Sequence, residues 1–311
     1  MAYEDSWAYP NYSSELFLIG EKKTPFLEMI GGLSNGGQTS QSFEFPMISS
    51  WELDAGSQPA ITEAASVAGQ TETAYARAQT KNTVQIFQEA INISYVKQST
   101  MGNLSGLNLA NASNAVANEK DFQIMAHLKQ IAKDVDYAFL NGVQQFATAT
   151  NVAAKTGGLT SLVPTANKVN AGNADITKDM IDAMLRQMAD NGAIFNTPIL
   201  LCSMLQKQRI STIYGYAPTD RKVGGVAIDM VETDATEFGI VWTPQLDSSK
   251  VVLVDAAYCS PVFCPVPGKG VLFYEDKDKP GASEGGQLYG QIGLNVGDVN
   301  NHGMIYGLTT T

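Results

Sequence analysis

The first regular pattern along the chain is an alternation of apolar and polar residues that begins at Thr39. Phe43 and Phe45 share one face of this segment, which predicts a β-strand. A second alternating segment, NTVQIFQEAINISY, predicts a second strand. It changes phase directly after Ile86, which indicates either a bulge or a change of the exposed side. Two strands separated by a long connection predict an extended β-hairpin over residues 39–95.

The connection between these two segments is long and polar. Residues 49–82 read SSWELDAGSQPAITEAASVAGQTETAYARAQTKN and contain few large apolar side chains. A hairpin tip of this length cannot bury enough of its own surface to be ordered alone, so contact with another chain is expected. Trp51 and Tyr75, near its two ends, are aromatic residues of the kind that anchor interfaces. A flexible loop with Trp51 folded onto the chain's own core is the alternative.

The strongest helical pattern covers residues 118–141. Asn118 is suited to cap this helix, and Asn141 followed by Gly142 is a stop signal. A helix of this length is about 36 Å long, which is typical of a spine that supports a whole domain. Its apolar residues recur at intervals of three and four and form one stripe: Phe122, Met125, Leu128, Ile131, Val135 and Phe139.

The remaining patterns describe a mixed α+β chain. A short helix is expected in TPFLEMIGG, and a turn and strand are expected in KTGGLTSLV. A second amphipathic helix is expected in DITKDMIDAMLRQMADNG, with its inward side chains at Ile181, Met184, Leu185 and Met188. A third helix is expected in MLQKQRISTIYG. The expected strands, in order, are TPILLCS, VAIDMVET, FGIVWTP, KVVLVDAAY, PVFCPV, GVLFYE, GQLYGQIGLNV and HGMIYGL. These elements do not form a regular βαβ series.

Composition restricts the partners of the chain. The 311 residues carry a net charge of −11, and no segment is rich in Lys and Arg, so no basic footprint for nucleic acid is present. An acidic protein can still enclose DNA without adhering to it, because like charges repel. Charged residues make up only 16% of the chain, which favours a surface partly buried against other chains. No apolar segment is long enough for a membrane helix, and the N-terminus is not a secretory signal.

Residues with catalytic or metal-binding chemistry do not form a recognisable motif. The three cysteines, Cys202, Cys259 and Cys264, are expected to be structural thiols in a reducing compartment. His127 and His302 lie in no metalloprotease or triad context. PVPGKG lacks the second glycine of a phosphate-binding loop, and no nucleophile elbow is present. We therefore expect no catalytic, cofactor-binding or metal site, although paired carboxylates of an α+β enzyme or carbohydrate-binding protein are not excluded by sequence.

The order of the segments, and the sequences of several of them, resemble those of a known family. The segments that carry the resemblance are KTPFLEMIGG, SQPAITEAASVAGQTETAYARAQTKNTVQIFQEAINISYVKQS, DFQIMAHLKQIAKDVDYAFLNG and HGMIYGL. As an ordered set they resemble the major capsid proteins of tailed bacteriophages with the Hong Kong 97-like fold. The resemblance covers nearly the whole chain.

The resemblance implies an α+β fold divided into four parts. These are an N-terminal arm at 1–38, an extended loop at 39–95, a peripheral domain at 96–171 and 257–311 that holds the spine helix, and an axial domain at 172–256. The axial domains would meet at the centres of hexamers and pentamers.

The resemblance also implies a structural function. The chain would assemble through hexamers and pentamers into an icosahedral shell that encloses double-stranded DNA without sequence-specific binding. It would do so in the host cytoplasm and remain in the virion, without a membrane or a cofactor. A scaffolding protein and a portal are expected partners, and a decoration protein is a further candidate. An encapsulin-like shell of a cellular nanocompartment is the alternative.

Two family features are not transferred to this chain. Many members carry a long removable scaffolding segment before the arm, whereas this sequence starts with the arm. Either a separate scaffolding protein or a processed N-terminus is therefore expected. Some members cross-link the loop through a Lys, but Lys81 lies at the base of the loop. The residues that we expect to contact other subunits are Trp51, Gln58, Pro59, Tyr75, Arg77, Lys81, Trp7 and Tyr9.

Overall fold

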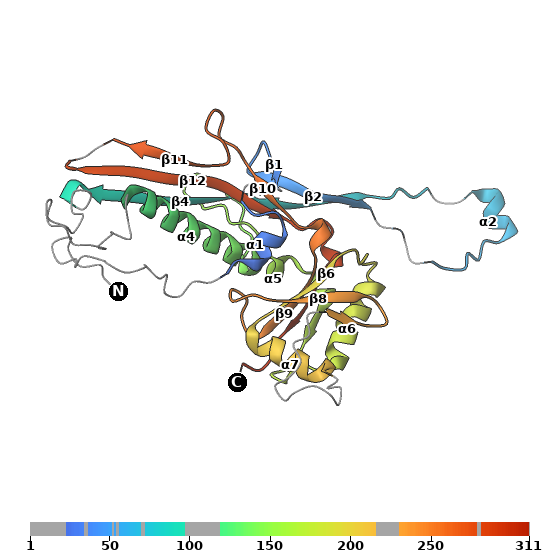
Figure 1. Ribbon diagram of the computed structural model, residues 1–311. Coiled ribbons are helices and arrows are strands. Elements are labelled where there is room, and N and C mark those ends of the chain that lie inside the picture. The colour runs from blue at the N-terminus through green and yellow to red at the C-terminus, as the bar shows by residue number, and fades with distance from the viewer. Residues whose placement is uncertain are drawn as a thin grey trace.

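The computed structural model describes residues 23–33, 37–51, 53, 56–69, 72–96, 119–215, 230–278 and 281–310. These residues form a five-stranded sheet with a long helix beneath it, a six-stranded sheet with two helices, and a two-stranded hairpin that projects away from both (Figure 1). The mixture of helices and strands is the α+β class that the sequence patterns predict.

The first sheet is built around the long strand β12. This strand pairs antiparallel with β4 on one side and with β10 and β11 on the other, and β1 adds to β10 in parallel. The strands of this sheet are β1 (Gln38–Thr39), β4 (Gln85–Ser94), β10 (Ser260–Phe263), β11 (Leu272–Lys277) and β12 (Ser283–Asn295).

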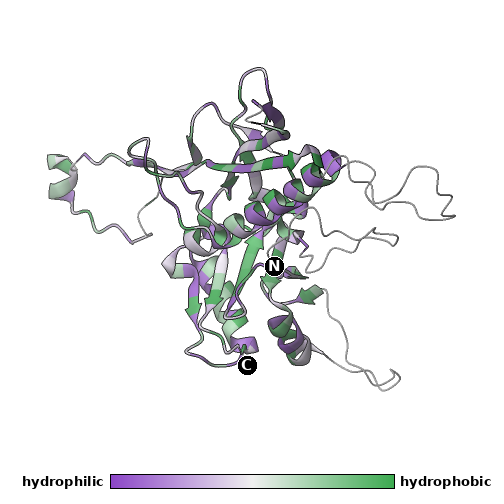
Figure 2. Cartoon of the chain, turned by 90° about the vertical axis from the view of Figure 1, so that its left-hand side faces the viewer, coloured by the Kyte–Doolittle hydropathy of each residue, from purple (hydrophilic) through white to green (hydrophobic). Residues whose placement is uncertain are grey.

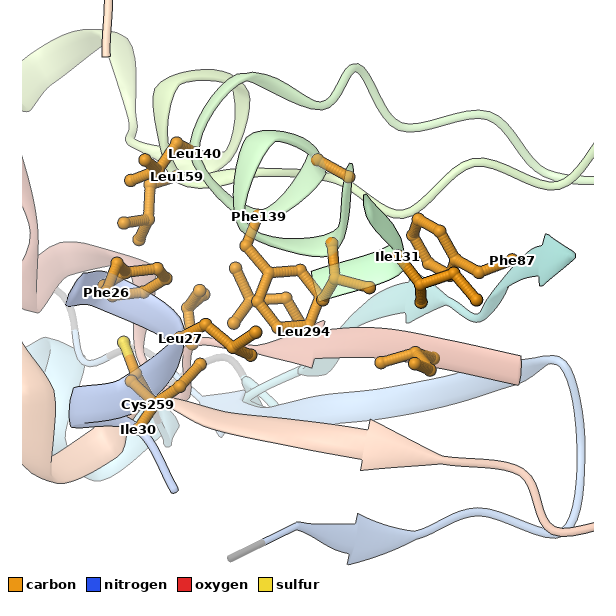
Figure 3. Close-up of a cluster of buried hydrophobic side chains, with 14 of the residues drawn as sticks. Phe26, Leu27, Ile30, Phe87, Ile131, Phe139, Leu140, Leu159, Cys259 and Leu294 are labelled. Atoms are coloured by element: carbon orange, nitrogen blue, oxygen red, sulfur yellow. The ribbon is translucent and has the colours of Figure 1, made fainter. Parts of the chain in front are cut away.

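Helix α4 (Glu119–Asn141) is the predicted spine and lies along one face of this sheet (Figure 1). Its turns carry both hydrophilic and hydrophobic residues, as expected for a helix that packs on one side (Figure 2). Ile131 and Phe139 are fully buried and meet Phe87 of β4 and Leu294 of β12 in one core (Figure 3). The buried side chains therefore join the helix to the sheet that it supports.

Two short helices complete this core. Helix α1 (Pro25–Met29) begins with a proline at its first turn, where the missing N–H costs nothing, and it buries Phe26 and Leu27. Helix α5 (Leu159–Leu162) contributes Leu159, and both helices pack against α4 (Figure 3).

The second sheet has the order β5-β13-β9-β6-β8-β7. Helices α6 (Lys178–Asp190) and α7 (Met204–Tyr214) share a second core with it, and the predicted inward side chains of α6 are all buried. Leu201 and Val252 point to the other side and belong to the first core. The strands are β5 (Lys168–Asn170), β6 (Pro198–Cys202), β7 (Met230–Glu232), β8 (Glu237–Trp242), β9 (Lys250–Asp255) and β13 (Gly303–Tyr306).

Three short 3-10 helices connect these elements: η1 (Thr165–Asn167), η2 (Ala256–Tyr258) and η3 (Val299–Asn301). Asp255 caps η2 by accepting a hydrogen bond from the N–H of Ala257, and Asp298 caps η3 in the same way from Asn300.

The hairpin consists of β2 (Glu44–Trp51) and β3 (Arg77–Thr83), paired antiparallel, with helix α2 (Glu63–Ala68) near its tip. Thr62 caps α2 by accepting a hydrogen bond from the N–H of Ala65, and no residue of this helix is buried. In Figure 1 the hairpin and α2 extend away from both sheets. A helix with no buried residue receives no stability from this chain's own core.

The hairpin differs from its prediction in its second strand. The segment that follows Val84 does not pair with β2; it is β4 and pairs along its whole length with β12. The partner of β2 comes instead from residues 77–83, which the sequence pattern assigned to the tip. The phase change after Ile86 is not a bulge, because β4 pairs with β12 without a register shift from Gln85 to Ser94. It is the alternative, a change of the exposed side, since Val84 is fully buried and Ile86 is 47% exposed.

Two further expectations are wrong. KTGGLTSLV contains helix α5 and no strand, since Gly158 lets the chain turn close to the end of α4. Met125, expected on the apolar stripe of the spine helix, is 60% exposed. The buried residues of α4 all lie between 131 and 140, so only the second half of the helix is covered by the core. The final strand, β13, lies in the six-stranded sheet beside β9 and β5, whereas β10, β11 and β12 lie in the five-stranded sheet.

Other expectations concern parts outside the described residues, among them the cap at Asn118, the arm before residue 23, and the first half of VAIDMVET. The three cysteines are free thiols, two of them buried, and burial raises the pKa of the Cys202 thiol to about 12. Among the helices that the structure describes, none is both long and apolar enough to span a bilayer.

Candidate functional site

The candidate contact residues lie on the hairpin. Six of the eight expected residues are described, and all six are exposed: Trp51, Gln58, Pro59, Tyr75, Arg77 and Lys81. The other two, Trp7 and Tyr9, lie outside the described residues. The structure therefore gathers the described candidates on one projecting element.

Trp51 and Tyr75 face each other where the hairpin ladder ends. Their ring centroids are 6.2 Å apart and the ring planes are inclined by 63°, an edge-to-face arrangement. Trp51 is 61% exposed and Tyr75 is 56% exposed. The alternative in which Trp51 folds onto the chain's own core is therefore wrong, since Trp51 packs against Tyr75 and leaves most of its surface open.

Two basic residues lie on β3. Arg77 is the ladder partner of Trp51, and its side chain is exposed. Lys81 lies 3.9 Å from the carboxylate of Glu44, with both side chains about half exposed. An exposed pair of this kind contributes at most about 1 kcal/mol to stability, so Lys81 can leave Glu44 for a partner's carboxylate at little cost.

The tip of the hairpin carries apolar side chains that sequence reasoning did not select. Leu53, Ile61 and Val67 are 62%, 55% and 85% exposed. Exposed apolar residues on a projecting element are typical of a surface that another molecule covers. The signal in the sequence was weak, because only small and polar residues, DAGSQPA and TEAAS, separate these three side chains.

The base of the hairpin is held by Asn82, whose side chain is fully buried. Its amide nitrogen donates to the carbonyl oxygens of Leu294 (2.7 Å) and Gly157 (3.1 Å), and it lies 3.3 Å from the hydroxyl of Thr156. Its amide oxygen accepts from the N–H groups of Gly157 (2.8 Å) and Thr83 (2.9 Å). One side chain thus ties the end of β3 to β12 and to the loop after α4.

A second contact strengthens the same base. Gln144 donates from its amide nitrogen to the carbonyl oxygen of Lys81 at 2.6 Å and lies 3.3 Å from the amide oxygen of Asn82. The hairpin therefore leaves the body from a fully hydrogen-bonded anchor. The sequence carries one signal that Asn82 is buried. It lies two positions before Val84, so in an extended chain the two side chains point to the same face, and Val84 is apolar.

The N-terminal helix α1 is attached to the spine by a buried carboxylate. Asp136 of α4 has no exposed surface, and its Oδ1 accepts a hydrogen bond from the N–H of Leu27 at 2.9 Å. Its Oδ2 has no hydrogen-bond partner among the described residues. Burial raises the pKa of Asp136 to about 6, with a smaller contribution in the same direction from Glu28.

The two histidines have structural surroundings. His302 is buried; its Nδ1 accepts from the N–H of Asp255 at 3.2 Å, and its Nε2 lies 2.8 Å from the carbonyl oxygen of Val296, which requires the Nε2–H tautomer. Burial lowers the pKa of His302, so the ring is neutral. His127 lies 3.4 Å from the carboxylate of Glu89. In the described part of the chain, no group of three or more His, Cys, Asp or Glu residues is arranged to hold a metal ion.

Comparison with known families gives one match across the chain. A family model described as "SU10 major capsid protein" matches residues 2–309. No curated protein matches the chain by sequence.

Solved structures with similar folds cover almost the full length of both chains. The Cyanophage A-1(L) capsid protein has a TM-score of 0.63 at 11% identity, over 94% of this chain and 96% of that one. The capsid of the native GTA particle has a TM-score of 0.62 at 10% identity, over 98% and 97%. The holo-SrpI encapsulin complex of Synechococcus elongatus PCC 7942 has a TM-score of 0.59 at 10% identity, over 100% and 98%. At these identities the likeness concerns the fold, which is Hong Kong 97-like.

Proposed function

The chain belongs to the SU10 major capsid protein family, and we propose that copies of it assemble through hexamers and pentamers into an icosahedral shell around double-stranded DNA. The observation that carries the proposal is the family match over residues 2–309, because it covers the body and the hairpin together. A capsid shell protein of this fold requires surfaces that bind other copies, and the hairpin is the exposed element that supplies one.

We propose that the hairpin is the extended loop and lies over a neighbouring copy. Its apolar residues Leu53, Ile61 and Val67 are open to solvent, and Trp51 and Tyr75 leave more than half of their surface uncovered. A loop that binds the next copy, which in turn binds a further one, makes the heterologous contacts that rings and shells need.

The two sheets suggest the division of the body. We propose that the six-stranded sheet with α6 and α7 is the axial domain, and that the five-stranded sheet with α4 is the peripheral domain. This keeps the expected division at residues 172–256 but adds β5 and β13 to the axial domain, because both strands pair within its sheet. The arm at 1–38 retains its proposed role of reaching a neighbouring copy.

The proposal includes no catalytic step. The net charge of −11 suits a shell that encloses DNA without sequence-specific contacts, since the wall repels the phosphate backbone. A scaffolding protein, a portal and a decoration protein are proposed partners, with assembly in the host cytoplasm before the shell becomes part of the virion. An α+β enzyme or carbohydrate-binding protein finds no support in a capsid family.

An encapsulin-like shell is the second candidate, favoured by the likeness to the SrpI complex over the whole chain. The two functions differ in what the shell contains. Packaged double-stranded DNA, together with genes for a portal in the neighbourhood, supports the viral shell. A protein cargo and shells free of DNA support the nanocompartment.

Electron microscopy of the purified full-length chain tests the proposal, with the chain expressed alone and together with its neighbouring gene products. Closed particles with five-fold and six-fold vertices are the expected result. If size exclusion and negative stain find only monomers or small oligomers under both conditions, the proposal fails.

A further inference from the structure

A groove runs along the edge of β4, between this strand and helix α4. Its volume is about 550 Å³, and five consecutive residues of the strand, Gln85–Glu89, line one side of it. Asp134, Tyr137 and Asn141, three residues on one side of α4, line the other. Because neighbouring residues of a strand point to opposite faces, a groove lined by all five follows the edge of β4.

This edge of β4 has no strand beside it in the described part of the chain. The whole ladder of β4, ten residues long, is with β12 on the opposite edge. An unpaired edge presents alternating N–H and C=O groups, and a strand from another chain can pair with them. The groove gives such a strand a place to lie.

The hairpin also has strand edges without a neighbouring strand among the described residues. Strands β2 and β3 pair only with each other among the described residues, so they form an isolated two-stranded ribbon. Such a ribbon is marginally stable in water, and a third strand adds to its stability. The edge of β3 that faces away from β2 can therefore pair with a strand of another copy.

Charge selects β3 as the strand that enters the groove. Glu89 lies on the face of β4 that carries the buried Phe87, and its carboxylate reaches His127 of α4, so it is on the helix side of the groove. Asp134 lies on the same side. Strand β3 carries Arg77 and Lys81 on one face, whereas the only charged residue of β2 is Glu44.

We propose that β3 of a second copy pairs with the edge of β4 at residues 85–89 and places Arg77 against Glu89 and Asp134. The small residues Ala78 and Thr80 then lie on the outer face of the extended sheet, beside the half-exposed Ile86. This inference rests on the proposed function, because it requires two copies in contact.

Charge exchange tests the pairing in the full-length chain. Arg77→Glu and Asp134→Lys should each reduce the yield of closed particles by roughly tenfold, because like charges then face each other, and the double variant should recover most of the yield. Lys277→Glu, on an exposed position of β11, is the matched control and should assemble normally. Thermal unfolding of each unassembled variant checks that the body is intact. A double variant that assembles no better than the single variants contradicts the pairing.

Hydrogen exchange gives the second test. In wild-type particles, those amides of residues 85–89 that point away from β12 should exchange at least about tenfold more slowly than in the unassembled Arg77→Glu variant. Equal exchange in both states means that the groove is empty in the shell and overturns the inference, while the particles themselves still support the proposed function. Protection that appears only after a neighbouring gene product is added assigns the groove to that protein and also overturns the inference. Absence of wild-type particles overturns the proposed function itself.

Discussion

The indole ring of Trp51 and the phenol ring of Tyr75 meet edge to face, with centroids 6.2 Å apart, at the point where the two strands of the projecting hairpin separate. Both side chains remain more than half exposed. The pair therefore closes the ladder on one side and offers aromatic surface on the other. Aromatic rings held in a defined position lose little entropy when a partner covers them, which makes this pair suited to an interface.

Trp51→Ala is expected to reduce particle formation strongly while it leaves the body folded. The ring pair contributes about 0.5–1.5 kcal/mol to the hairpin and nothing to either core. Negative-stain counts of particles and the melting temperature of the unassembled chain are the measurements. Met125→Ala, on an exposed position of α4, is the control. Normal particle yield from Trp51→Ala would show that the ring is not a contact.

Replacement of residues 53–74 by a short Gly-Ser turn should give a soluble, folded chain that forms no shells. None of the residues of α2 is buried, so the deletion removes no core contact. Circular dichroism and size exclusion measure the fold and the oligomeric state. Particles of normal size from this variant would contradict an assembly role for the tip.

Asp136→Asn is expected to stabilise the chain at neutral pH. The pKa of Asp136 is raised to about 6, so the fold favours the neutral acid; this contribution is complete below the ordinary value near 3.8 and is lost as the pH rises through about 6. The amide keeps the acceptor for Leu27 and cannot ionise. Above pH 7 the gain should reach up to about 3 kcal/mol, and the rise in stability between pH 6 and 4 should become smaller.

Urea unfolding of the unassembled chain at several pH values measures this effect. Glu237→Gln, at an exposed position of β8, is the control and should leave the pH dependence unchanged. If Asp136→Asn and the wild type lose stability in parallel as the pH rises from 4 to 7, the buried carboxylate is not its source.

Asn82→Ala should destabilise the base of the hairpin by about 2–4 kcal/mol, because it leaves the buried N–H of Gly157 and the carbonyl of Leu294 without their partner. Faster hydrogen exchange is expected in β3 and at residues 156–157. Asn92→Ala, on the exposed side of β4, is the matched control. A change of less than about 0.5 kcal/mol would mean that water replaces the amide at no cost.

The elements with long, regular patterns were predictable from the sequence. The spine helix was expected over residues 118–141 and is described from Glu119 to Asn141, and the inward residues of α6 are those that its period selects. Both follow from a local rule, since side chains three and four positions apart share a face of a helix.

Pairing between distant strands was not predictable in the same way. The segment of β3 was expected to belong to the tip but pairs with β2, and no pattern indicated that β13 lies between β5 and β9. The alternation of a strand indicates which of its faces is buried, but not which strand lies beside it. The sequence predicted an extended hairpin, whereas the pairing of β2 with β3 in the structure showed which residues form its second strand.

The sequence by itself determined the class of the fold, most of its helices and strands, and the family, because these depend on local periodicity and on the order of segments. The tertiary structure decided which polar residues are buried, as with Asn82 and Asp136, and which strand edges have no neighbouring strand in the described part of the chain, as with residues 85–89 of β4. Those properties depend on contacts between residues that are far apart in the chain, such as Asn82 and Leu294, 212 positions away. No local pattern encodes such a contact, and it exists only once the two sheets, the spine helix and the hairpin are assembled.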